Sequence, residues 1–148
     1  MDWYIKAFQK LTNDDLYAIL KLRMDIFVVE QECHYPELDN HDQEAIHYFL
    51  KDGHDIVANA RILPKNTMSQ EASIGRVAVA EKYRSRNYGR LIMQKAIDYI
   101  SGQWNESVIK IEAQAHLKKF YADLGFRQVS EPYLDDGIPH VDMIWKRN

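Results

Sequence analysis

The hydrophobic and polar positions of the chain recur with two periods, and the central stretch 73–100 shows the change between them most clearly. Residues 77–80 alternate β-branched valine with alanine, which is the period of a pleated strand. The apolar residues of 92–100 recur instead at helical spacing. The period changes across residues 81–89. This stretch is therefore predicted to be a strand, a turn and a helix.

The same two patterns predict the other elements. Alternation favours strands at 3–8, 47–51, 56–63, 74–80, 108–113, 126–130 and 140–146. Capping residues at 12–15 begin a helix that runs to about residue 30, and 116–124 form a short helix ended by Gly125. Strand, helix and strand in succession require a parallel pair. We therefore predict a single α/β domain over residues 1–148, with a mixed central sheet, a parallel central strand pair and flanking helices.

Composition narrows the class of protein. The chain has 148 residues, 46% of them hydrophobic, which is enough for a core without disulfides, and its only cysteine is Cys33. A net charge of −3 gives no general attraction to nucleic acid or to an anionic membrane. The first eight residues lack the pattern of a signal peptide, and no apolar run approaches the ~20 residues of a membrane span. We expect a soluble cytoplasmic protein.

The turn between the central strand and helix is basic. It contains Lys82, Arg84, Arg86 and Arg90, together with Asn87 and Gly89, the residue types that most easily adopt positive φ. Such a turn can aim several backbone N–H groups at one anion, and the following helix adds the positive end of its dipole. A diphosphate is one ligand that fits. The alternative is an ordinary connection with a solvated basic face.

Two segments carry a resemblance to a known family. Arg84-Ser85-Arg86-Asn87-Tyr88-Gly89 resembles the pyrophosphate loop of the GNAT N-acyltransferases, Gln/Arg-x-x-Gly-x-Gly/Ala, with Asn87 at the first glycine. That position should need a left-handed backbone, which Asn tolerates better than most residues. The segment from Gln114 to Phe126 resembles the family's Asn-x-x-x-x-x-x-Tyr-x-x-x-Gly-Phe pattern, with Tyr121 at the tyrosine. The resemblance covers nearly the whole chain and is greatest to the ElaA-type subgroup.

The resemblance implies acetyl-CoA as the acyl donor, held without a metal. Backbone groups of Val77 and Val79 would pair with the pantetheine arm, and the Val79 N–H would lie near the thioester carbonyl. Tyr121 would be the general acid, since phenol and thiol have reference pKa values of about 10 and about 8.5. The implied cofactor-binding residues are Val77, Ala78, Val79, Arg84, Ser85, Arg86, Asn87, Tyr88, Gly89, Arg90, Gln114 and Phe120.

The sequence identifies the general base and the acceptor site less narrowly than the donor site. Glu112 and His116 are the two candidates for the base, although either could simply be a solvated surface residue. The resemblance places Asp136 and His140 at the border of the acceptor site. Acidic groups of the loop 31–42 and the preceding Glu30 could attract a cationic amine. This acidic region has no C-x-x-C or H-x-x-x-H pair, so we expect no metal.

The combined interpretation is an acetyl-CoA-dependent N-acyltransferase that acts by direct attack of an amine in a ternary complex. The acceptor is a primary amine on a small molecule or a peptide, with no nucleic-acid or membrane partner. A coenzyme A-binding regulatory module with little turnover is the alternative. The oligomeric state stays open, with a homodimer as one possibility.

Overall fold

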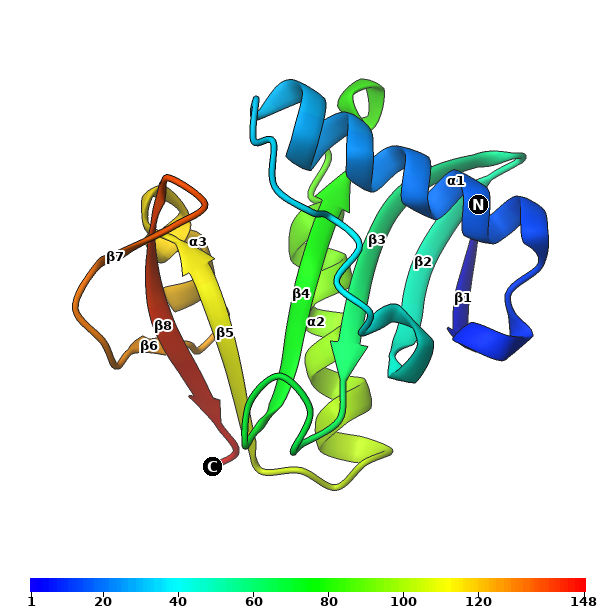
Figure 1. Ribbon diagram of the computed structural model, residues 1–148. Helices are drawn as coiled ribbons and strands as arrows, with labels where there is room; N and C mark the ends of the chain where they lie inside the picture. The colour runs from blue at the N-terminus through cyan, green and yellow to red at the C-terminus, as the bar shows by residue number, and fades with distance from the viewer.

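A computed structural model of the chain describes all residues, 1–148, as one mixed eight-stranded sheet with helices on both faces (Figure 1). Only the β4–β5 pair is parallel, which confirms the predicted parallel central pair. β6 and β7 both pair with the outer edge of β8. In spatial order the strands are β1 (Asp2–Ala7), β2 (Ile46–Asp52), β3 (Asp55–Leu63), β4 (Ala72–Val79), β5 (Val108–Gln114), β8 (Ile138–Lys146) and β6 (Arg127–Gln128), with β7 (Tyr133–Asp135) beside β8.

Helix α1 (Asn13–Arg23) covers one face of the sheet and packs Ile19 against Phe49 and Ile56. Its first turn is capped by Thr12, whose Oγ1 accepts from the Asp15 N–H at 3.0 Å. The helix continues to Glu30, as predicted, but Met24–Glu30 is π-helical. The apolar pattern did not reveal this change, because the segment has only 7 residues, of which Ile26 alone is buried, and so defines no period.

Helix α2 (Tyr88–Gly102) lies on the opposite face and contributes the centre of the core. Its apolar residues fall at the predicted positions, and Ile92, Met93, Ile97 and Ile100 are almost wholly inaccessible to solvent. Each such side chain stabilises the fold by roughly 1.5–3 kcal/mol through its burial. Alternate residues of β5 meet the same core, so its remaining side chains point to the α1 side.

The C-terminal third differs from its prediction in detail. Helix α3 (Lys118–Ala122) follows a 3₁₀ turn, Ala115–Leu117, and is shorter than the predicted 116–124. Gly125 ends it at φ +102°, while the Phe126 N–H donates to the Tyr121 carbonyl and the Gly125 N–H to that of Ala122, a Schellman motif. The predicted strand 126–130 shrinks to Arg127–Gln128.

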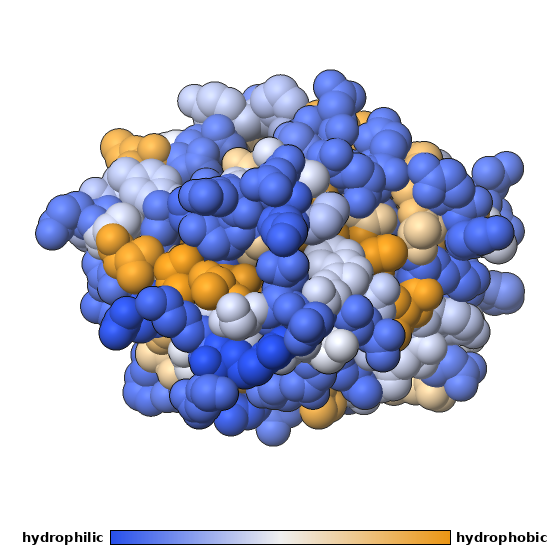
Figure 2. Space-filling view, turned by 90° about the horizontal axis from the view of Figure 1, so that it is seen from below, coloured by the Kyte–Doolittle hydropathy of each residue, from blue (hydrophilic) through white to orange (hydrophobic).

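Strand β7 was not predicted. It forms a hairpin with β8 through Asp136 and Gly137, both at positive φ, as a two-residue primed turn requires. None of the helices combines the length and apolar composition needed to cross a membrane. Seen from below, the surface is mainly hydrophilic, with apolar residues in small separate patches (Figure 2).

Candidate active site

A cleft opens where β4 and β5 separate. The two strands pair only at Ala72 with Ile109 and at Ser73 with Lys110, and then diverge toward their C-terminal ends (Figure 1). The cavity between them has a volume of about 600 Å³. It is lined by the π-helical segment, the following loop, β4, β5, the start of α3 and the β7–β8 hairpin. Ends of several elements that are distant in sequence therefore converge on one cavity.

A bulge in β4 lies at the wall of this cleft. The register with β3 shifts between Asn59 and Arg61, and Arg76 takes the extra position with φ +51°. The Asn59 side chain holds the bulge by donating from Nδ2 to the Arg76 carbonyl at 3.3 Å. The bulge shifts the pairing of β4 with β3 by one residue, just before the residues of β4 that face the cleft.

Beyond the bulge, β4 presents free backbone groups. The Ala80 N–H donates to the Val57 carbonyl at 2.9 Å, so in an antiparallel ladder the groups of Ala78 also face β3. Those of Val77 and Val79 then point away from β3, into the space left by the departure of β5. An extended ligand could pair with this edge as an additional strand.

The loop before α2 also presents free donors. Asn87 has φ +67°, which confirms the predicted left-handed backbone, and Ser85 has φ +65°. None of the backbone N–H groups from Ser85 to Arg90 donates to an acceptor in the protein, and Asn87 makes no side-chain cap. Together with the α2 dipole, these donors could bind an anion.

Arg84 connects this loop to both walls of the cleft. Its Nε donates to the Val79 carbonyl at 3.2 Å, and its Nη1 lies 3.0 Å from Glu30 Oε1. The guanidinium therefore covers the end of β4 and joins it to the end of the π-helical segment. Glu30, which the sequence placed at the acceptor site, lines the cleft with this arginine as its partner.

Gly89 lies inside the first turn of α2 without positive φ, so Ser85 and Asn87 supply the left-handed backbone of the loop. A Cβ at Gly89 would lie 3.7 Å from the Phe120 ring and 3.8 Å from Val79 Cγ2, which is ordinary van der Waals contact. The start of α2 therefore lies beside both β4 and α3, with room for a small side chain at this position.

Tyr121 lies at the cleft on the α2 and α3 side of the sheet. Its ring packs edge-on against Phe120 and Phe126, with centroid distances of 5.1 and 6.2 Å. The hydroxyl has no hydrogen-bond partner in the protein, and burial raises the pKa of Tyr121 to about 12. The side chain is thus a protonated donor facing the cavity.

The opposite side of the cleft carries the acidic and imidazole side chains. Glu112 points there from β5, and desolvation, then the charges of Asp135 and Asp142, raise its pKa. Asp142 accepts from the Tyr133 hydroxyl at 2.5 Å and lies 3.6 Å from Lys110 Nζ. Glu112, Asp135 and Asp136, by contrast, line the cavity without an ion-pair partner.

Of the other predicted site residues, Ala78, Gln114, His116, Phe120 and His140 also line this cavity, whereas the loop residues Ser85 to Arg90 lie outside its lining. His140 pairs with Gln114 across β8 and β5, and His116 is exposed in the 3₁₀ turn. Gln114 donates from Nε2 to Gln31 Oε1 at 3.3 Å, and Cys33 Sγ lies 3.6 Å from the Asp136 carbonyl. The segment after the π-helix thus spans the opening and contacts both β5 and the hairpin.

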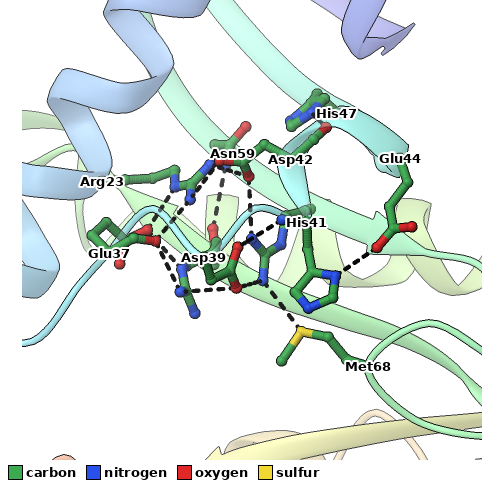
Figure 3. A network of polar contacts seen from close by, with 11 residues as sticks. Arg23, Glu37, Asp39, His41, Asp42, Glu44, His47, Asn59 and Met68 are labelled. Carbon is green, nitrogen blue, oxygen red and sulfur yellow. Dashed lines mark hydrogen bonds and ion pairs between the residues drawn. The ribbon is translucent and has the colours of Figure 1, made fainter.

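The acidic loop 31–42 differs most from its prediction. Three arginines hold it (Figure 3). Arg23, which is fully buried, donates to Glu37 at 2.7 Å and to Asp42 at 2.8 Å. Arg61 binds both carboxylate oxygens of Asp39, at 2.8 and 2.9 Å. These three carboxylates are therefore paired with arginines, which disfavours a role for them in attracting an amine.

The third arginine ties the loop to the β4 bulge, because Arg76 Nε donates to Glu37 Oε2 at 2.6 Å. Burial alone would raise the pKa of Asp39, but the hydrogen bonds and charge of Arg61, with Arg76, outweigh it and lower that pKa to about 2. The loop is consequently fixed against β3 and β4. The residues of the chain include no group of three or more His, Cys, Asp or Glu arranged to hold a metal ion.

This arrangement, a sheet divided at its parallel pair with a turn of free backbone N–H groups beside the division, is that of the GNAT acyltransferases. Residues 24–147 match the acetyltransferase (GNAT) domain, and the chain belongs to that family.

Its relatives place it more narrowly, beside ElaA. The chain is 37% identical to protein ElaA of Escherichia coli K12, over 97% of this chain and 95% of that protein. The crystal structure of Escherichia coli ElaA superposes with a TM-score of 0.91 at 35% identity, covering 99% of this chain and 100% of the other. An acyl-CoA N-acyltransferase from Pseudomonas aeruginosa is equally similar, with a TM-score of 0.91 and 35% identity over 98% and 99% of the two chains.

Proposed function

We propose that the protein is an acetyl-CoA-dependent N-acyltransferase that transfers the acetyl group to a primary amine by direct attack in a ternary complex. One observation carries the proposal. The unpaired edge of β4 and the unpartnered Tyr121 hydroxyl meet one cleft, and Arg84, which also lines it, begins the loop whose N–H groups from Ser85 to Arg90 are free. The name of the Pseudomonas aeruginosa relative, an acyl-CoA N-acyltransferase, supports the class of reaction.

The residues present fit the donor. A diphosphate would accept hydrogen bonds from the loop N–H groups of 85–90, helped by the nearby charges of Arg86 and Arg90. The backbone of Val77 and Val79 would hold the pantetheine arm along β4. Gln114 would reach its amides, since its side-chain carbonyl is not used in the bond to Gln31.

Two groups would act on the thioester. The Val79 N–H points into the cleft and would donate to the acyl carbonyl, a contribution typically worth ~10²-fold or more in rate. Tyr121 would protonate the departing thiolate. Its pKa of about 12 lies further above the reference thiol value, about 8.5, than the sequence suggested. Burial of the thiolate in the same apolar surroundings raises the thiol pKa as well and narrows this difference.

The acceptor would approach from the α1 side of the sheet. Glu112, Asp135 and Asp136 are carboxylates without ion-pair partners there, and they favour an amine that arrives as an ammonium. This wall replaces the loop carboxylates as the acidic border of the acceptor site.

Comparing wild type with Tyr121→Phe distinguishes an enzyme from a coenzyme A-binding regulatory module. We expect acetyl-CoA to bind with micromolar Kd by calorimetry in both wild type and variant, since the lost hydroxyl binds nothing in the protein. We expect kcat for thiol release in the presence of amines to fall about 10²-fold or more. Tyr17→Phe, on the exposed face of α1, is the matched control and should change neither quantity.

Normal acetyl-CoA binding without amine-dependent thiol release in the wild type would favour the regulatory module. No detectable binding would contradict both functions.

A further inference from the structure

We propose that His140 is the general base that deprotonates the acceptor amine. The proposal rests on the N-acyltransferase function and assigns a role that Glu112 and His116 were expected to fill. It is based on the hydrogen bond of the ring, on its position across the sheet from Tyr121 and on the charged groups that face it.

The backbone fixes the tautomer of His140. Its Nδ1 lies 2.7 Å from the Ile138 carbonyl oxygen, which can only accept a hydrogen bond. Nδ1 therefore carries the hydrogen, and in the neutral ring Nε2 keeps its lone pair. Tyr133 stacks on the ring at a centroid distance of 6.2 Å and an interplanar angle of 24°. The orientation of Nε2 is thus determined by contacts on two sides.

His140 and Tyr121 approach the cleft from opposite sides of the sheet. Tyr121 packs with the core on the α2 and α3 side, whereas His140 pairs with Gln114 in β5 and shares the side of Glu112. Both residues line the same cavity. An acyl group bound between them would have the amine and its base on one side and the leaving thiolate and its acid on the other.

The neighbours of His140 suit a base that becomes an imidazolium. Glu112 faces it from β5, Tyr133 and Asp135 from β7, and Asp136 from the turn, while Asp142 follows it on the same face of β8. Lys110 lies further along this side and is paired with Asp142. A proton taken from the ammonium would therefore be received among carboxylates. A raised pKa would by itself suit Glu112 to the role of base, but no hydrogen bond in the protein orients its carboxylate, whereas the Ile138 carbonyl holds the ring of His140.

His116 lacks comparable support. It is exposed in the 3₁₀ turn, and no hydrogen bond to the protein fixes either of its ring nitrogens. Its ring is therefore not held in one orientation by the protein, as that of His140 is.

The protons balance as follows. The substrate ammonium gives one proton to His140 Nε2, which passes it to solvent, and the neutral amine forms the C–N bond as the C–S bond of the thioester breaks. The departing thiolate takes the Tyr121 proton. The second proton, lost by the new amide nitrogen, restores the Tyr121 phenol. The net products are the amide, the free thiol and one proton.

His140→Asn keeps a side-chain N–H for the Ile138 carbonyl and removes the base. With benzylamine, which is protonated at neutral pH, we expect kcat/KM to fall about 10²-fold or more. The pH at which kcat/KM rises should shift toward the pKa of the amine itself. With aniline, which is already neutral, the loss should be less than about tenfold, and the acetyl-CoA Kd should stay within about twofold in calorimetry. His54→Asn, at an exposed position in the β2–β3 turn and outside this cavity, is the control and should leave the rates with both amines within about twofold.

A residue that only shapes the site would lower the rates with both amines equally, and that result would overturn the proposal. Nitrogen-15 NMR of histidine-labelled protein, with the His140 signals assigned by the variant, gives a readout independent of turnover. The Nδ1–H tautomer is expected at neutral pH, and the Nε2–H tautomer would overturn the assignment. Failure of the wild type to bind acetyl-CoA would instead contradict the proposed function itself.

Discussion

Tyr121 shows how one local motif prepares a catalytic group. The Schellman motif that ends α3 takes the Tyr121 carbonyl as the acceptor of the Phe126 N–H, so the backbone at this residue is fixed. Phe120 and Phe126 then surround the ring and leave the hydroxyl at the cavity. The same apolar contacts that place the group also keep it protonated, because they disfavour the phenolate.

The raised pKa of Tyr121 has a consequence for stability. In the unfolded chain this phenol titrates near pH 10, whereas in the fold its pKa is about 12. Folding therefore favours the protonated form, and this contribution is complete below about pH 10 and is lost as the pH rises toward 12. We expect the unfolding free energy of the wild type to fall in this window by up to about 3 kcal/mol more than that of Tyr121→Phe. Urea titrations between pH 9 and 12 measure this difference in unfolding free energy. If the unfolding free energies of the wild type and Tyr121→Phe fell in parallel with pH, the Tyr121 ring would not be desolvated.

Several strands and helices end at the cleft. Backbone with positive φ occurs near two of these ends, in β4 and in the loop before α2. Arg76 in the bulge of β4, and Ser85 and Asn87 in the loop before α2, all have positive φ. At Arg76 the unusual conformation accompanies the shift in register with β3, and at Ser85 and Asn87 it belongs to a loop whose backbone N–H groups have no acceptor in the protein. Strain of this kind persists where surrounding contacts determine the conformation, as the Asn59 and Glu37 side chains do for Arg76.

The left-handed backbone at Asn87 predicts opposite effects for two small substitutions. Asn87→Ala should lower the unfolding free energy by about 1 kcal/mol and weaken acetyl-CoA binding, because alanine disfavours φ +67° and the loop N–H groups would diverge. Asn87→Gly should bind at least as well as the wild type, since the Asn87 side chain caps nothing. Calorimetry and thermal unfolding check both. Equal binding by the two variants would mean that the loop geometry does not depend on this residue.

At the scale of the whole molecule, the sequence predicted the elements better than their junctions. The spacing of Ile92, Met93, Ile97 and Ile100 was sufficient for α2, and Asn87 alone indicated the left-handed loop. The separation of β4 from β5 has no local signal, since it follows from pairing limited to two residue pairs. The same is true of the bulge at Arg76.

The arginine network was also missed, although the sequence contains a signal for it. Arg23 continues the apolar face of its helix, four residues after Ile19, and Arg61 lies between Ala60 and Ile62 in a buried strand. A positively charged side chain on the buried face of a helix or strand requires a carboxylate partner. The acidic loop that follows α1 supplies three of them, and this complementarity could have predicted the contact.

Arg23 joins α1 to the loop that borders the cleft, so its loss should affect the whole domain. Arg23→Met should lower the unfolding free energy by about 3 kcal/mol or more, because Glu37 and Asp42 would each lose a buried ion-pair partner. Lys21→Met, on the same helix, removes only an exposed pair with Asp25 and should cost less than about 1 kcal/mol. Urea unfolding at neutral pH compares the two variants. Equal losses of unfolding free energy in the two variants would contradict the network. A large loss for Arg23→Met alone would show that the acidic loop 31–42 and the core unfold as one unit.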